Sequence, residues 1–413
     1  MFPRMCGSLR GGSDAHDRLR RQELLLGGNM KFEHYMPVRI LFGWGRLSEL
    51  GEVASSFGRR ALVVVGRRSA RRSGALDRAL DSLKRAGVDV EVFEGIPPNP
   101  TSTLVDEGAE EAKKKDCDIV VGLGGGSSVD CAKGIAVAAV EARPVWNYVV
   151  SEHPSGALPI IAVPTTSGTG TEANPYAVLT EPNLKEKRAL NRPPFTYPKA
   201  SIVDPELTLS LPPRGTAVTG MDVLFHALEA FVGKRCNPFV EAVAEQAVRG
   251  VTKFLVRAVK DGSDREAREG MSLASTAAGM AINGGGTTAL HGMEHPVSAH
   301  LDVAHAEGLC ALSGPYLKYL AEVVPWKMAR VAEWLGEDVS GLSEERAAEM
   351  AVVAIEELKE GLGLNLRLRD LGVHEDMLEI LVSDTLSVMG HNVANTPGEL
   401  DRGRIYEFFR EAM

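Results

Sequence analysis

The chain has 413 residues, of which 44% are hydrophobic. Because a single hydrophobic core stops growing at roughly 250 to 300 residues, we expect two domains. The net charge of -9 argues against sequence-independent binding to nucleic acid, and no apolar run approaches the roughly 20 residues of a membrane span. The five cysteines are scattered without a CxxC pair, which fits neither a disulfide framework nor a cysteine-based zinc site and favours a cytoplasmic location.

The first part of the chain predicts alternating strands and helices. Residues 1–29 are rich in arginine and lack the continuous apolar core of a secretory signal, so we interpret them as a disordered leader or a non-native extension. A strand pattern opens at Met30, and further short apolar runs cover residues 61–65, 88–93, 119–122, 160–163 and 201–203. Their lack of polar alternation is typical of strands covered by helices on both faces, which predicts βαβ units with a mostly parallel sheet.

The spacing of the apolar residues changes after Leu211. Apolar residues then recur at helical spacing, for example over residues 240–259, 344–362 and 375–389. We therefore expect a dinucleotide-binding α/β domain over residues 30–211 and an all-α, metal-binding domain over residues 212–413. A cofactor and a substrate would meet in the cleft between them.

A triple glycine, residues 124–126, stands between a buried strand and a helix that opens with Ser127 and Ser128. Glycines allow close backbone approach, and the N–H groups at a helix start favour a pyrophosphate. Asp130 and Lys133 follow on one helical face, so one could reach the cleft while the other anchors locally. A plain strand-to-helix turn is the alternative, and the pattern is not the GxGxxG fingerprint.

A second polar turn, Pro-Thr-Thr-Ser-Gly-Thr-Gly-Thr-Glu over residues 164–172, follows the strand at 160–163. Its hydroxyls and glycines can supply several hydrogen bonds to phosphate or ribose. Two such turns at strand ends of one sheet favour a nucleotide cleft over two unrelated loops.

Histidines and an aspartate suggest a metal centre in the second half. Asp222 and His226 are four residues apart in a helical pattern and therefore share one face. Downstream, four of the ten histidines fall within residues 291–305. One carboxylate and three imidazoles could hold Fe²⁺ or Zn²⁺, and the ion would act as a Lewis acid that lowers the pKa of an alcohol.

Together, the strings GGGSSVDCAK, PTTSGTGTE, SIVDPELTLSLPP and GMDVLFHALEAF and the histidine cluster resemble the iron-containing (group III) alcohol dehydrogenase family. The resemblance covers essentially Met30 to Met413 and is strongest to members that act on short aldehydes, such as butanol and 1,3-propanediol dehydrogenases. It implies the dehydroquinate synthase-like fold shared by the iron-dependent alcohol dehydrogenases.

By the resemblance, the metal ligands are Asp222, His226, His291 and His305. His295 is expected near the nicotinamide, where it would assist proton transfer, and Asp130 is the second catalytic candidate. His300 and His391 match no family role and are expected to be surface or packing residues. The cofactor contacts implied by the sequence and the resemblance are Gly66, Ser69, Asn99, Gly124, Gly125, Gly126, Ser127, Asp130, Thr165, Thr166, Thr169 and Lys187.

Two positions depart from the family pattern or bear on cofactor choice. The family usually has glycine after the last ligand, whereas this chain has Ala306. NAD-preferring members tend to place an aspartate after the second strand, whereas this chain has Gly66 followed by Arg67 and Arg68. These cations suit a 2′-phosphate, so NADP(H) is predicted in preference to NAD(H).

The sequence thus predicts an enzyme, a metal-dependent NAD(P)-linked alcohol dehydrogenase or aldehyde reductase, with Fe²⁺ expected and Zn²⁺ as the alternative ion. Its partner would be a short primary alcohol or aldehyde, without nucleic acid or membrane, and a cytoplasmic homodimer is the expected state. The alternatives are a dehydroquinate-synthase-like lyase that uses NAD transiently, or a non-catalytic nucleotide- or metal-binding protein. Val149, Leu224 and Phe225 are candidate walls of the substrate pocket.

Overall fold

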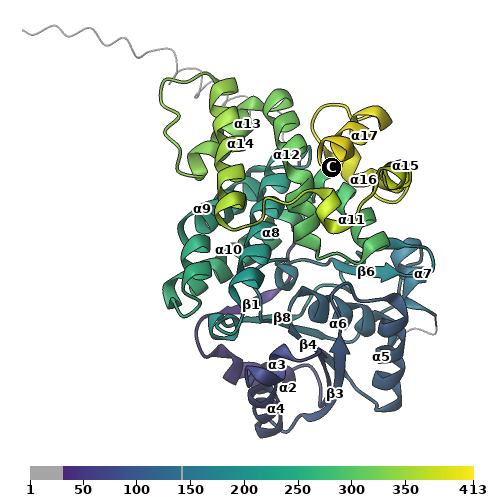
Figure 1. Ribbon diagram of the computed structural model, residues 1–413. Helices are drawn as coiled ribbons and strands as arrows, with labels where there is room; N and C mark the ends of the chain where they lie inside the picture. The colour runs from purple at the N-terminus through teal and green to yellow at the C-terminus, as the bar shows by residue number, and fades with distance from the viewer. Residues whose placement is uncertain (1–30, 141–142) are drawn as a thin grey trace, which may run out of the picture. The chain divides into compact units, whose positions relative to one another are not determined.

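A six-stranded sheet forms the first half of the chain. The computed structural model describes residues 31–140 and 143–413 (Figure 1), so the predicted leader lies outside the described residues. The strands are β1 (Arg39–Phe42), β2 (Arg60–Gly66), β3 (Asp89–Ile96), β4 (Ile119–Gly124), β5 (Ile160–Pro164) and β8 (Ala200–Val203). All paired neighbours in this sheet are parallel, which confirms the predicted sheet.

Two features of the strands differ from the prediction. The first described strand begins at Arg39, because residues 31–38 form no regular structure and Pro37 has no N–H to donate to a sheet. A separate antiparallel pair, β6 (Ala177–Glu181) and β7 (Glu186–Leu190), was not predicted. The latter strand carries charged residues at Glu186 to Arg188, so it lacks the apolar run that marks the central strands.

Helices cover both faces of the sheet, as the continuous apolar runs require. Alternate β2 residues belong to different cores: Val63 packs with α2 and α4, whereas Val64 packs with α5 and α6. The helices of this half are α2 (Leu50–Ser55), α3 (Ser69–Arg72), α4 (Ala75–Arg85), α5 (Ser102–Lys114), α6 (Gly126–Ala138) and α7 (Val145–Val150).

The order of the strands places the predicted turns at one edge of the sheet. The order is β1-β8-β5-β4-β2-β3, so the chain moves outward from β2 to β3 and then returns to the other side of β2. This reversal between β2 and β4 is a topological switch point, where ligands bind beyond the carboxyl ends of the strands. Gly66 ends β2 and Gly124 ends β4, so both lie at this point.

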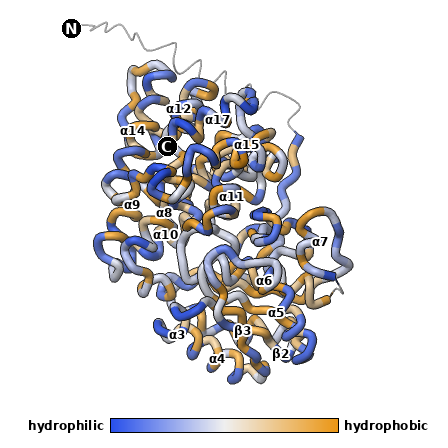
Figure 2. The backbone as a smooth tube through the Cα atoms, turned by 45° about the vertical axis from the view of Figure 1, so that its right-hand side comes forward, coloured by the Kyte–Doolittle hydropathy of each residue, from blue (hydrophilic) through white to orange (hydrophobic). Residues whose placement is uncertain are grey.

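Residues 212–413, all described, contain helices and no strand. In Figure 2, hydrophobic and hydrophilic stretches alternate along outer helices such as α9 and α14, whereas α8 is buried on all sides from Gly220 to Val232. The helices are α8 (Pro213–Val232), α9 (Pro238–Lys260), α10 (Arg265–Gly285), α11 (Ala289–Leu301), α12 (His305–Val323), α13 (Pro325–Trp334), α14 (Glu344–Gly361), α15 (Leu378–Ser387), α16 (Gly390–Asn395) and α17 (Arg402–Glu411).

No helix in the described part of the chain combines the length and apolar character that crossing a membrane requires. The four cysteines in this part, Cys117, Cys131, Cys236 and Cys310, are free thiols.

Candidate active site

The triple glycine and the second polar turn pack directly against each other. The backbone N–H of Thr165 donates to the carbonyl of Gly124 over 2.8 Å. A Cβ on Gly126, the first residue of α6, would lie 2.6 Å from the Thr169 side chain. Only glycine therefore fits here, and the first N–H groups of α6, which lack partners within the helix, are held at the carboxyl edge of the sheet.

The end of β2 adjoins the same turn. A Cβ on Gly66 would lie 3.7 Å from the hydroxyl oxygen of Ser128 and 3.9 Å from that of Ser69. Arg67 and Arg68 follow and are exposed, and nearby Arg71 is ion-paired with Glu94. Positive charge therefore stands beside Gly66 where NAD-preferring proteins would place a carboxylate.

Lys133 anchors the loop after β5. Its buried ammonium donates to the carbonyls of Thr171, Asn174 and Tyr176 and to the Thr171 hydroxyl, at 2.6 to 2.9 Å. Burial lowers its pKa to about 8. Asp130 accepts from the same Thr171 hydroxyl over 2.7 Å and from the Val178 N–H over 3.0 Å. Lys133 is thus the local anchor, and the Asp130 carboxylate is held at the wall of the cavity described below.

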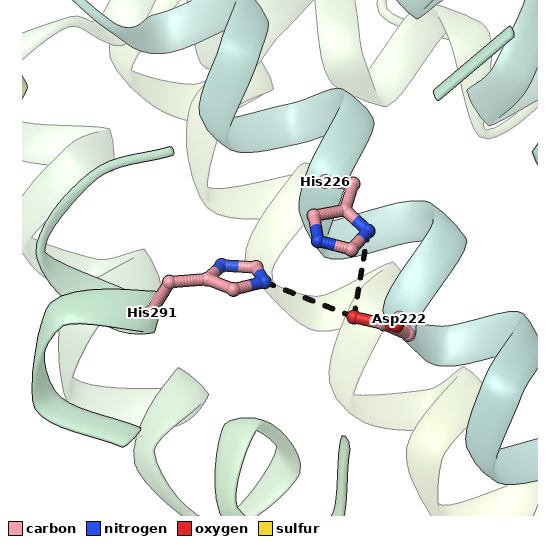
Figure 3. A group of neighbouring side chains, drawn as sticks. All are labelled: Asp222, His226 and His291. Atoms are coloured by element: carbon pink, nitrogen blue, oxygen red, sulfur yellow. Dashed lines mark ion pairs between the residues drawn. The ribbon is translucent and has the colours of Figure 1, made fainter. Parts of the chain in front are cut away.

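Asp222, His226 and His291 converge on one another from two helices of the helical half (Figure 3). Asp222 and His226 lie one turn apart on α8, and His291 reaches them from α11. The Asp222 Oδ1 is 3.5 Å from His226 Nδ1 and 3.7 Å from His291 Nε2, and the two imidazole rings stack with their centroids 4.5 Å apart. The structure thus brings these three predicted ligands together from two distant stretches of the sequence.

A buried carboxylate that sequence reasoning missed orients His291. Glu229 accepts from the His291 Nδ1–H over 2.8 Å, which turns Nε2 toward Asp222. Glu229 also accepts from the hydroxyl of Thr288 over 2.7 Å and from its backbone N–H. Since Glu229 is seven residues after Asp222, it lies on the same face of α8, and this spacing was a signal that could have identified it.

A second carboxylate plays the same part for His305. The His305 Nδ1 is hydrogen-bonded to Glu294, which leaves its Nε2 available as a ligand. The ring lies 5.2 Å from that of His291 and 5.5 Å from that of His295, between centroids. His305 therefore adjoins the group of three rather than contacting Asp222. Ala306 sits inside α12, where its Cβ is compatible with the regular helix.

The three central residues fit a divalent metal ion. Asp222 Oδ1, His226 Nδ1 and His291 Nε2 are buried and have no hydrogen-bond partner, an expensive arrangement unless a cation satisfies them. Burial alone would raise the pKa of Asp222, but His226 and its neighbours hold it well below its usual range. Burial lowers the pKa of His226 to about 4. Both side chains therefore have the ionisation state that metal ligands need.

His291 differs in its protonation. Burial alone would lower its pKa, but Glu229 and Asp222 outweigh burial and raise it to about 10. Without an ion the imidazole therefore carries a proton at neutral pH. An incoming cation must displace this proton to use Nε2.

His295 lies beside this group and is neutral. Burial, followed by the nearby charge of Lys187, lowers its pKa well below the usual range. Its Nδ1 is 3.2 Å from the carbonyl oxygen of Lys187 on β7, and the Lys187 ammonium is 3.7 Å from Glu294. The unpredicted β6–β7 pair therefore carries a buried lysine to the histidine cluster.

One cavity of about 360 Å³ joins the glycine turn to the histidines. Val149 lines it, whereas Leu224 and Phe225, the other expected pocket walls, are buried in the helical core. His391, expected to be a surface or packing residue, lines it as well. The predicted site residues on its wall are Asn99, Gly126, Ser127, Asp130, Thr169, Lys187, His226, His291, His295 and His305.

The remaining predicted residues lie outside this wall. Asp222 lies beside His226 and His291, and the others lie at or just after the ends of β2, β4 and β5, around the glycine turn. His300 instead pairs with Asp384 over 2.8 Å. The predicted residues that do not line the cavity are Gly66, Ser69, Gly124, Gly125, Thr165, Thr166 and Asp222.

Comparison with known proteins agrees with this arrangement. Residues 37–205 match the family described as iron-containing alcohol dehydrogenase, and residues 216–413 match its C-terminal part. The 1,3-propanediol dehydrogenase of Citrobacter freundii is 38% identical over 92% of this chain and 98% of its own length. The NAD-dependent methanol dehydrogenase of Bacillus methanolicus is 35% identical over 85% of this chain and 92% of its own length.

Solved structures show the same fold. An alcohol dehydrogenase from an archaeal halo-thermophile of a Red Sea brine pool has a TM-score of 0.90 at 36% identity, covering 94% of this chain and 100% of its own. A 1,3-propanediol oxidoreductase has a TM-score of 0.88, also at 36% identity, covering 93% of this chain and 100% of its own. With its parallel sheet, buried histidine cluster and these relatives, the chain belongs to the iron-containing alcohol dehydrogenase family, whose members are metal-dependent, nicotinamide-linked oxidoreductases.

Proposed function

We propose that the protein interconverts a short primary alcohol and its aldehyde, with Fe²⁺ as the ion and NADP(H) preferred over NAD(H). One observation carries this proposal: three unpartnered buried ligand atoms adjoin the cavity that also reaches the start of α6. The names of the relatives, which include methanol, 1,3-propanediol and butanol dehydrogenases, support a short alcohol.

Each residue has a distinct part in this proposal. Asp222, His226, His291 and His305 would hold the ion, which when bound supplies Lewis acidity toward the oxygen of the alcohol or aldehyde. The backbone around Gly126 would bind the pyrophosphate.

His295 and Asp130 complete the proposed site. As a neutral imidazole, His295 can accept a proton during alcohol oxidation and return it during aldehyde reduction. The Asp130 carboxylate, fixed by its two donors, would orient the cofactor.

Cofactor preference can be tested at Gly66. A Cβ at this position meets no atom closer than 3.7 Å, so Gly66→Asp should fold normally. The new carboxylate would repel a 2′-phosphate and accept from a ribose hydroxyl. The ratio of kcat/KM for NADPH to that for NADH should therefore fall by about tenfold or more, and an unchanged ratio would refute the NADP preference.

The activity itself is tested by metal analysis and NADPH oxidation across a graded series of aldehydes, comparing the wild type with His291→Ala. The wild type should consume one NADPH per aldehyde, and the variant should lose both bound metal and activity. Activity in His291→Ala after chelation would refute the metal site. A lyase would consume no NADPH overall, and cofactor binding without turnover would indicate a non-catalytic protein.

We further propose that the enzyme is a cytoplasmic homodimer that binds neither nucleic acid nor membranes. The net charge of -9 and the scattered cysteines support this setting. Light scattering of the purified protein would measure the oligomeric state, and a monomer would refute that part.

A further inference from the structure

The cavity wall carries positive charge that the proposed chemistry does not use. Arg188 on β7, Arg235 in the turn after α8 and His391 on α16 all line it. These three residues are called the basic cluster, in which the two arginines carry the positive charge. They come from segments far apart in sequence, so their meeting is a property of the fold.

Arg235 is the member whose charge is available. Its Nε donates to the carbonyl of Gly285 over 3.3 Å, and its guanidinium lies over Gly286, where a Cβ would collide with it. No carboxylate in the described parts of the chain lies within ion-pair distance of Arg235, whereas Arg188 is paired with Glu186 over 2.7 Å. Its side-chain partners are neutral groups, the Gly285 carbonyl and the Tyr176 hydroxyl, so its charge is left for a ligand.

Hydrogen bonds fix the turn that carries Arg235 against α16, and the members of the cluster lie close enough to affect one another electrostatically. The Lys234 N–H donates to the Asn395 carbonyl over 2.8 Å, and the Arg235 N–H donates to the Asn395 side chain over 3.1 Å, which fixes the turn against α16. Burial, then Arg235 and Arg188, lower the pKa of His391. Both guanidiniums are therefore close enough to the His391 imidazole to affect its protonation, and all three groups face the same cavity.

Carboxylates are scarce on the wall of the cavity. Asp130 is the single carboxylate among the described residues that line the cavity, and it already accepts from Thr171 and Val178. The chain as a whole has a net charge of -9, so the excess of positive charge on the cavity wall is opposite in sign to the net charge of the protein. The cluster also lies on β7 and the helical half rather than at the carboxyl ends of β2, β4 and β5, where the cofactor phosphates are expected.

We propose that the preferred substrate is a short aldehyde whose far end carries a carboxylate, and that Arg235 binds this carboxylate with Arg188 close by. The guanidinium presents paired N–H donors that match the two carboxylate oxygens. This inference rests on the proposed function and adds the substrate class to it.

The test compares two aldehydes of the same chain length, 4-oxobutanoate and its methyl ester, which lacks the negative charge and carries one extra methyl group. The wild type should show a higher kcat/KM for 4-oxobutanoate. In Arg235→Gln the ratio of the two kcat/KM values should fall about 10- to 100-fold, the range for a lost hydrogen bond to a charged group. Arg235→Lys, which keeps the charge, should restore part of the ratio, and Arg249→Gln, an exposed arginine on α9 paired with Glu245, should leave it unchanged.

The outcomes separate this inference from the proposed function. Equal reduction of both aldehydes by the wild type, or an unchanged ratio in Arg235→Gln, would overturn the inference and leave the alcohol dehydrogenase activity standing. A fall in NADPH affinity as large as the loss of 4-oxobutanoate selectivity would assign the cluster to the cofactor and overturn it too. If the protein oxidised NADPH with neither of these aldehydes nor with any member of the graded series, both proposals would be refuted.

Discussion

Replacing Glu229 with glutamine should change how metal binding depends on pH. In the wild type, Glu229 and Asp222 raise the pKa of His291 to about 10, so at about pH 7 a metal ion must displace a proton at a cost of about 4 kcal/mol. The metal dissociation constant should therefore fall about tenfold for each pH unit between about pH 7 and pH 9. In Glu229→Gln the neutral amide no longer raises the pKa of His291, and the slope should become shallow.

The intrinsic affinity should move in the opposite direction. Near pH 10, where proton competition is small in both proteins, the variant lacks the charged hydrogen bond at Nδ1, whose contribution is about 1.5 to 3 kcal/mol. Its zinc affinity should therefore be about 10- to 100-fold weaker than that of the wild type.

Competition with a chelator of known affinity, repeated across the pH range, measures both quantities. Glu241→Gln is a matched control, because this carboxylate pairs with Arg330 outside the cavity and should leave the slope unchanged. If the metal affinity of Glu229→Gln depended on pH as steeply as that of the wild type, Glu229 would not control the protonation of His291.

The stability of the metal-free wild type should also depend on pH. The raised pKa of His291 means that folding stabilises the protonated imidazole. The melting temperature should therefore fall as the pH rises from 6.5 through the folded pKa of about 10, and a constant melting temperature over this range would contradict the prediction.

Two further substitutions test the cofactor end. Gly126→Ala places a Cβ 2.6 Å from the Thr169 side chain. It should weaken NADPH binding about tenfold, measured by fluorescence titration. The control Gly361→Ala, whose Cβ meets no atom within 4 Å, should leave NADPH binding unchanged. Lys133→Met leaves buried carbonyls of the loop after β5 without their donor and should reduce the free energy of unfolding by about 3 kcal/mol, measured by urea denaturation; an unchanged midpoint would show that the ammonium does not anchor the loop.

The sequence predicted the central sheet because its strands carry a pattern that few other structures share. Ala61 to Val65 and Ile119 to Gly122 are continuous apolar runs, and such runs require helices on both faces. The β6–β7 pair escaped prediction because it contains charged residues and is stabilised by its position beside α11 rather than by its own composition.

The site was predictable in its ligands but not in the groups that orient them. Asp222 and His226 could be paired from helical spacing, and the resemblance supplied His291 and His305. Helical spacing places Glu229 on the same face as Asp222, but nothing local in the sequence shows that Glu229 or Glu294 is buried or which histidine it contacts. Their role depends on tertiary contacts between α8, α11 and α12, which only the folded chain reveals.

The distribution of the ligands along the chain constrains when the enzyme can mature. Ribosomal synthesis completes every strand of the sheet with Val203, before Asp222, His226 or His291 has been made. His305, at the start of α12, emerges last of the four. Cofactor recognition can thus form on an early part of the nascent chain, whereas iron loading must wait until most of the polypeptide has left the ribosome.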